Sequence, residues 1–219
     1  MENTRAKTTR NSLILLLTAT IWGMAFVSQS KGMDYMHPFT FNGVRSLIGA
    51  AGILVYILIS RKIAGDKAAK LDWKLNVRAG LLCGIFLTIA STLQQFGIKY
   101  TSVGKAGFIT TLYIIFVPMF GVFLKKKVAP VVWAAAGMAA VGMYLLCMTE
   151  SLRLGAGDIM VFLCAIAFAI QIMTVDHYAA RIDGAVVSCI QFTVCGVVCC
   201  IGALIWGQPT FGQSFRSEE

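Results

Sequence analysis

Glutamine side chains inside long apolar runs are the first residues of this chain whose type and spacing predict binding chemistry. Trp22, Phe26 and Gln29 follow one another at helical spacing, so they share one face of a helix. Phe168 and Gln171 repeat the last two positions of this pattern later in the chain. Each glutamine therefore either lines a polar cavity or bonds a neighbouring helix, and the sequence leaves both interpretations open.

Arg45 is the one charged residue that lies clearly inside an apolar run, on a face that it shares with Asn42 and Gly49. A charge in hydrocarbon costs roughly 2.5–3.5 kcal/mol on insertion scales, so this guanidinium must face protein or water and be held by acceptors. A carboxylate at a helix end, such as Asp34, is a candidate acceptor. Arg45 is then either a group that attracts an anion or a structural residue whose long side chain reaches the membrane surface.

Two further apolar runs carry polar side chains that are candidates for the same site. Gln94 and Gln95 lie in one run, and Thr111 and Tyr113 lie in the next. Pro118 follows them and frees a backbone carbonyl one turn earlier, so we expect it to bend its helix and shape a cavity.

The elements that position these residues are apolar blocks long enough to cross a membrane. Apolar residues make up 58% of the chain, charged residues 13%, and the mean hydropathy is +0.76. A bilayer core of about 30 Å takes roughly 20 helical residues, and the blocks do not alternate as barrel strands do. We predict an all-α integral membrane protein with seven spans, within a few residues of 12–30, 39–60, 78–98, 106–124, 128–148, 157–176 and 185–206. Gly80-x-x-x-Gly84 in the third block favours close helix packing.

The loops between these blocks predict the orientation in the membrane. Most of the 19 Lys and Arg residues precede the first block, separate the second from the third, or follow the fourth and sixth. Cytoplasmic loops carry the excess of positive charge, so we predict a cytoplasmic N-terminus, residue 219 outside and a bacterial inner-membrane location. The net charge of +9 therefore reports topology and indicates no nucleic-acid partner.

A weak internal repeat relates the two ends of the chain. A shift of 142 positions pairs Gln29 with Gln171, and four further residues in the next loop pair Arg45 with Gln191. The unit contains five spans, and an odd number inverts the second copy. We therefore predict a first repeat over 1–150 and an incomplete second repeat over 151–219, seven helices of an expected ten. On this prediction the chain is truncated, and a complete site requires the missing C-terminal helices or a second copy of the chain.

Other function classes lack their signatures. No Gly-x-Ser-x-Gly elbow, His-Glu-x-x-His helix or phosphate-binding Gly-rich loop occurs, so we expect no enzyme. His37 and His177 are far apart and the cysteines lack Cys-x-x-Cys spacing, so neither a metal nor another cofactor is expected. A seven-helix receptor needs its N-terminus outside, against the charge bias, and a receptor, a scaffold or a membrane enzyme is kept as the alternative class.

Several segments in order resemble EamA-like permeases of the drug/metabolite transporter superfamily. The stretch LLLTATIWGMAF from Leu15 to Phe26, followed by Pro38-Phe39 and Arg45, resembles the family's opening. Gln95 to Ser102 and Gly107 to Pro118 resemble its third and fourth helices. Gly157-Asp158 with Ala165 to Phe168 is similar to the start of its second repeat. These segments together cover nearly the whole chain.

The resemblance implies two inverted five-helix repeats, a central cavity, and transport of amino acids, other metabolites or drugs. Family cavities are lined chiefly by helices one, three and four and their repeat partners, which implies that Trp22, Gln94, Gln95, Thr111 and Tyr113 lie near the substrate. Residues 12–30 contain no glutamate, which disfavours the proton-coupled multidrug export of the small four-helix relatives. The resulting hypothesis is a permease in a lipid bilayer that moves a small metabolite, an amino acid or a related compound, as an exporter.

Overall fold

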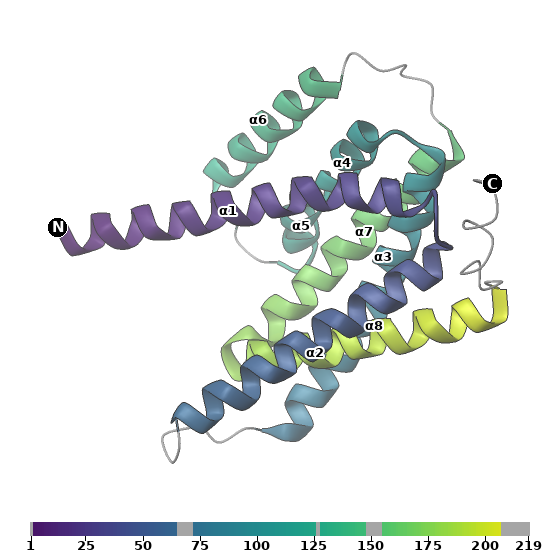
Figure 1. The fold of residues 1–219 in the computed structure, drawn as a ribbon. Helices are drawn as coiled ribbons and strands as arrows, with labels where there is room; N and C mark the ends of the chain where they lie inside the picture. Colours follow the sequence, from purple (N-terminus) through teal and green to yellow (C-terminus); the bar gives the residue numbers. More distant parts are fainter. Residues whose placement is uncertain (1, 65–71, 126–127, 148–154, 207–219) are drawn as a thin grey trace.

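The computed structural model describes residues 2–64, 72–125, 128–147 and 155–206, and these residues form helices, without a strand among them (Figure 1). The elements are α1 (Glu2–Gly32), α2 (Pro38–Ala64), α3 (Trp73–Tyr100), α4 (Val103–Thr111), α5 (Tyr113–Phe123), α6 (Pro130–Cys147), α7 (Ala156–Tyr178), η2 (Ala179–Arg181) and α8 (Gly184–Trp206). This confirms the predicted all-α class.

Six spans in the described residues are long and apolar enough to cross a membrane, and a shorter apolar helix covers Pro130–Gly142. Each of the seven predicted blocks therefore falls on helix, although the fifth is shorter than a full span by this measure. Polar residues at the turns set where helices begin. Asp72 Oδ1 accepts a hydrogen bond from Leu75 N (3.1 Å), and Ser102 Oγ accepts one from Lys105 N (3.2 Å), which satisfies donors in the first turns of α3 and α4.

The fourth span is divided between α4 and α5 at Leu112. There the amide of Leu112 donates to Ile109 O (3.2 Å) and the amide of Ile115 donates to Leu112 O (2.9 Å), the tighter i to i−3 pattern of a 3₁₀ turn. Pro118 lies inside α5 and does not end it. The expected distortion is thus present, but it lies more than one turn before the proline, next to Thr110 and Thr111.

Helix α3 lies at the centre of the bundle, between α7 and α8, and α2 pairs with α8 (Figure 1). A Cβ added at Gly80 would lie 2.7 Å from Ile190 Cβ, and one at Gly84 would lie 2.8 Å from Val194 Cβ. The Gly80-x-x-x-Gly84 pattern therefore permits the close approach of α3 and α8, as predicted from the sequence.

The last turn of α3 crosses the first turn of α7 with the two backbones in contact. A Cβ at Gly97 would lie 2.9 Å from Gly157 O, and one at Gly157 would lie 2.8 Å from Gly97 O. Neither position can carry a larger residue without separating the helices.

Helix α1 contacts the bundle through its C-terminal part, where it meets α3 and α4, and its N-terminal half extends away from the other helices (Figure 1). The 18-residue apolar window of this helix contains no buried residue. Its leucine and isoleucine side chains are therefore exposed on the surface of the described chain, as lipid-facing or partner-facing residues are in membrane proteins.

We expect Gly97→Ala to destabilise the fold by about 1–3 kcal/mol, the usual cost of overpacking. For a chain of this length that lowers the thermal unfolding midpoint in detergent by several degrees. Gly49→Ala is the matched control, because nothing lies within 4 Å of a Cβ at Gly49 and alanine favours the helix. Equal midpoints for the two variants would show that the α3–α7 crossing tolerates separation.

Candidate functional site

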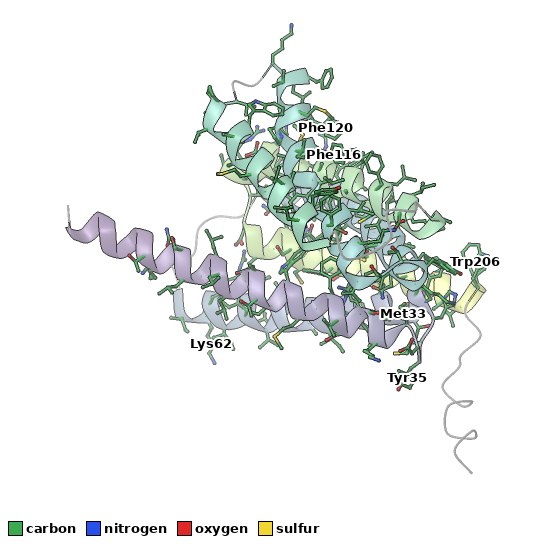
Figure 2. The ribbon with its side chains drawn as sticks, turned by 90° about the horizontal axis from the view of Figure 1, so that it is seen from above. Met33, Tyr35, Lys62, Phe116, Phe120 and Trp206 are labelled. Carbon is green, nitrogen blue, oxygen red and sulfur yellow. The ribbon has the colours of Figure 1, made fainter. Side chains whose placement is uncertain are left out.

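The two ends of the bundle differ in their polar chemistry. Tyr35 and Trp206 lie at one end and Lys62 lies toward the other in Figure 2. We call the end that holds Asp158 the Asp158 end and the opposite one, which holds Asp183, the Asp183 end.

Polar side chains within the spans gather along α3 where α1, α2 and α4 contact it, near the Asp158 end. We call this set the polar crossing; it comprises Gln29, Asn42, Arg45, Ser91, Gln94, Gln95 and Thr110. All of these residues except Arg45 are buried, and the exposed fraction of each is 5% or less. Buried polar groups in a membrane bundle require partners within it, so this cluster is the strongest candidate site in the described chain.

Asn42 joins α2 to α3 at the centre of the polar crossing. Its Nδ2 donates to the Ser91 carbonyl oxygen (2.9 Å), and its Oδ1 accepts from Arg45 Nη2 (2.9 Å). The prediction that Asp34 accepts the Arg45 hydrogen bond is therefore wrong. Asn42 takes its place because it lies one turn earlier on the same face of α2.

Arg45 remains exposed on the surface of the described residues, although it lies in a span. Among those residues its guanidinium donates one hydrogen bond, to Asn42, and lies 5.6 Å from the centre of the Phe41 ring. A guanidinium has five N–H donors, so this arrangement leaves capacity for a bidentate anion.

The side-chain amide of Gln95 on α3 contacts the backbone carbonyl of Gln29 on α1. Gln95 Nε2 donates to the Gln29 carbonyl oxygen (3.4 Å), and Gln29 Nε2 donates to the Ala25 carbonyl oxygen (3.2 Å). The Oε1 atoms of both side chains are buried and accept no hydrogen bond within the described structure. These two oxygens are acceptors for which the bundle supplies no donor.

The other predicted site residues lie apart from this pair. Gln94 Nε2 donates to Thr110 Oγ1 (3.2 Å) within the polar crossing. Thr111 bonds Gly107 O of its own helix (2.7 Å) and lines a small apolar cavity against α6. Tyr113 packs against Phe168 and its buried neighbours.

Trp22 and Gln171 are also not part of the polar crossing. Trp22 is 51% exposed on α1. Gln171 Nε2 donates to Gln191 Oε1 (3.0 Å), which joins α7 to α8. Of the eight residues predicted from the sequence, the structure thus brings together Gln29, Arg45, Gln94 and Gln95.

The structure holds a buried ion pair at the Asp158 end that is not predicted from the sequence. Asp158 is 3% exposed; its Oδ2 accepts from Lys105 Nζ (2.8 Å) and from Gly155 N (2.9 Å), and its Oδ1 accepts from Thr101 Oγ1. This network fixes the turn between α3 and α4 to the first turn of α7. Lys105 and Asp158 are 53 positions apart, and only the proximity of each to a span end was visible in the sequence.

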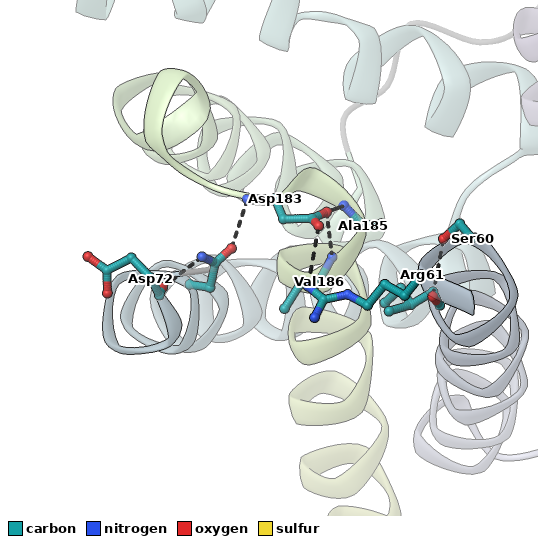
Figure 3. Close-up of polar contacts among 8 residues, drawn as sticks. Ser60, Arg61, Asp72, Asp183, Ala185 and Val186 are labelled. Carbon is teal, nitrogen blue, oxygen red and sulfur yellow. Dashed lines mark hydrogen bonds and ion pairs between the residues drawn. The ribbon is translucent and has the colours of Figure 1, made fainter. Parts of the chain in front are cut away.

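Asp183 organises the opposite end (Figure 3). Its carboxylate accepts from the amides of Ala185 (3.0 Å) and Val186 (3.3 Å) in the first turn of α8, and its own amide donates to Asn76 Oδ1 (2.9 Å). Arg61 Nη2 lies 3.7 Å from Asp183 Oδ2, but both side chains of this pair are more than 40% exposed. This contact is therefore weaker than the Lys105–Asp158 pair.

An open apolar groove of about 580 Å³ lies toward the Asp183 end between α3, α5 and α7. Leu82, Phe120, Met173, Thr174 and His177 are among the residues that line it. The helices α3, α4 and α7 are thus joined closely at the Asp158 end and leave a groove toward the Asp183 end. Within the described residues no group of three His, Cys, Asp or Glu side chains could hold a metal.

We expect Asp158→Asn to destabilise the protein by about 3–5 kcal/mol, because it leaves the largely buried Lys105 ammonium without its counter-charge. The combined variant Lys105→Met/Asp158→Asn should recover part of this loss. Arg61→Gln is the control and should cost less than about 1 kcal/mol, because its pair is exposed. Thermal unfolding in detergent measures all three, and a smaller loss for Asp158→Asn than for Arg61→Gln would contradict this account.

Comparisons with known proteins agree with this geometry. The model of the EamA-like transporter family matches residues 10–148. An uncharacterised transporter of Archaeoglobus fulgidus is 30% identical over 171 residues, which are 75% of this chain and 48% of that protein. The chain therefore spans about half the length of this relative. A family match over more than half of the chain, on a bundle of membrane-spanning helices with a polar crossing inside it, establishes that this protein belongs to the EamA-like transporter family.

Proposed function

We propose that the protein is a permease that exports a small polar metabolite, an amino acid or a related compound, across a bacterial inner membrane. The observation that carries this proposal is the polar crossing, in which Arg45, at the surface of the described helices but within a span, has unused donors and the buried Gln29 and Gln95 have unused acceptors. Such groups are costly unless a polar solute or water meets them, and intramembrane polar residues commonly mark substrate paths.

Gln29, Arg45, Gln94 and Gln95 are the proposed substrate contacts, and Trp22, Thr111, Tyr113 and Gln171 are proposed to contact the substrate elsewhere along its path. The last four lie on α1, α4, α5 and α7, the helices that surround the polar crossing or border the groove.

The charge distribution favours a cytoplasmic position for the Asp183 end. Arg61, Lys62, Lys74, Arg78 and Arg181 belong to helix ends that the fold brings together there. By the positive-inside rule this end faces the cytoplasm, as does the N-terminus. The groove then opens to the cytoplasm, the side from which an exporter collects its substrate.

A complete path requires more helices than the described residues supply, because α1 exposes a whole apolar surface beside the polar crossing. We propose that the second five-helix repeat, or a second copy of the chain, covers this surface. The pairing of α2 with α8, the second helices of the proposed repeats 1–150 and 151–219, supports an inverted arrangement of the two units.

Substitution of Arg45 tests the proposed site. We expect Arg45→Gln to lower flux per folded molecule about tenfold or more for a carboxylate-bearing substrate, because a charge-assisted bidentate contact is lost. Arg45→Lys should retain part of the flux, since it keeps the charge but not the planar fork.

The measurement is flux in proteoliposomes of the whole transporter, normalised to folded protein, for an amino acid and for its amide. The amide should be insensitive to Arg45→Gln. Unchanged flux per molecule for both compounds would make Arg45 a structural residue and remove it from the site.

A further inference from the structure

We propose that α3 binds an anionic phospholipid at the Asp183 end, with the phosphate on Lys74 and Arg78 and an acyl chain along the apolar side chains that follow. An open hollow of about 540 Å³ lies there on the surface of the described chain. We call it the Trp73 hollow; the residues that line it are Trp73, Lys74, Val77, Arg78, Leu81 and Leu82. This lipid site is separate from the polar crossing and does not depend on the proposed transport function.

Two cationic side chains on one face of α3 border the Trp73 hollow. Lys74 and Arg78 are four positions apart, a spacing that places their Cβ atoms about 5–6 Å from each other on a helix. Both residues are exposed, and neither side chain makes an ion pair or a hydrogen bond with another described residue. Their charged groups are therefore available to a phosphate, whose oxygens match the fork of a guanidinium.

The carboxylates at this end have other contacts. Asp72 Oδ1 accepts from Leu75 N (3.1 Å), and the Asp183 carboxylate accepts from two amides of α8 and lies 3.7 Å from Arg61. Cations also outnumber carboxylates among the described residues of these helix ends, which include Arg61, Lys62, Lys74, Arg78 and Arg181 against Asp72, Asp176 and Asp183. The local charge therefore favours an anion at the Trp73 hollow.

The order of residues along α3 matches the layers of a lipid leaflet. Lys74 and Arg78 are separated by about 6 Å along the helix axis, and a head-group layer is roughly 5–7 Å thick. Trp73, at the start of the span, is 60% exposed, and an indole at this depth is typical of the membrane interface. The cations and the indole thus lie where a phosphate group lies in a bilayer.

Apolar surface begins directly below the cations. Val77, Leu81 and Leu82 line the same hollow, and Leu81 is 46% exposed. Leu82 also lines the apolar groove between α3, α5 and α7, so the two depressions meet at this side chain. An acyl chain that descends from a phosphate on Lys74 and Arg78 therefore covers apolar side chains that water would otherwise contact.

This combination selects an anionic phospholipid over related ligands. A soluble phosphate would contact the cations and leave the apolar part of the hollow uncovered. A zwitterionic phospholipid would bring its own cation beside Lys74 and Arg78, which like-charge repulsion disfavours. The proposed cytoplasmic position of the Asp183 end agrees with this choice, because anionic lipids of the cytoplasmic leaflet attract Lys and Arg next to a span.

Bromine on a lipid chain quenches tryptophan fluorescence at short range, so Trp73 reports which lipid lies beside it. The test uses the whole protein with every other tryptophan replaced by phenylalanine, in nanodiscs of phosphatidylcholine. A small share of the lipid is replaced by brominated phosphatidylglycerol or by brominated phosphatidylcholine with the same chains. We expect phosphatidylglycerol to bind beside Trp73 about tenfold or more tightly than phosphatidylcholine.

Lys74→Gln and Arg78→Gln should each lower this preference about fivefold, the usual contribution of one Lys or Arg at an anionic surface, and the double variant should abolish it. Lys74→Arg keeps the charge and should retain the preference. Lys62→Gln is the matched control, because it removes one exposed cation toward the same end without changing the hollow (Figure 2). It should leave the preference unchanged.

A second reporter, with Trp206 as the remaining tryptophan, lies toward the opposite end and should show no preference for the anionic lipid (Figure 2). Equal quenching of Trp73 by the two lipids, or an unchanged preference in the double variant, would overturn the inference. Absence of quenching by either lipid would also overturn it, because another helix would then cover this face. Loss of the preference in inorganic phosphate, but not in chloride of equal ionic strength, would assign the cations to a soluble anion and contradict the lipid site.

Discussion

The fold depends on one constraint: a polar group inside a hydrocarbon layer must find its partner within the protein. Helix α3 meets this constraint for most of the bundle. Its carbonyl at Ser91 accepts from Asn42, its Gln95 contacts α1, and its Gln94 contacts Thr110 on α4. Among the described residues, Oε1 of Gln29 and Oε1 of Gln95 remain without a donor, and they are part of the argument for the proposed site.

Close helix approach makes these contacts possible. Lipid provides little hydrophobic force between helices, so association relies on small residues and buried polar contacts. Gly97 and Gly157 allow α3 and α7 to touch at the Asp158 end, where Lys105 and Asp158 then pair. Toward the Asp183 end the same helices leave a groove. The bundle is therefore closely packed at one end and grooved at the other.

The amino-acid sequence predicts most of the fold and four of the seven residues that form the polar crossing. Runs of apolar residues locate the helices because hydrocarbon thickness sets their length, and Gly80 and Gly84 reveal a packing face. The Asn42 acceptor for Arg45 and the Lys105–Asp158 pair were not predicted, because the first was a choice among several nearby acceptors and the second joins helices far apart in sequence. Pro118 correctly indicated a distorted span, but the break lies at Leu112.

The central claim is that α1, α2 and α3 hold a solute between Gln29, Gln95 and Arg45. A high-resolution structure of the whole protein in lipid with L-leucine bound tests this most directly. The account predicts the leucine carboxylate on the Arg45 guanidinium, at about 2.7–3.2 Å between nitrogen and oxygen, with the Gln29 and Gln95 side chains against the same molecule. A direct contact of Arg45 with Gln29, ordered water on the Gln95 oxygen and leucine bound elsewhere would contradict it.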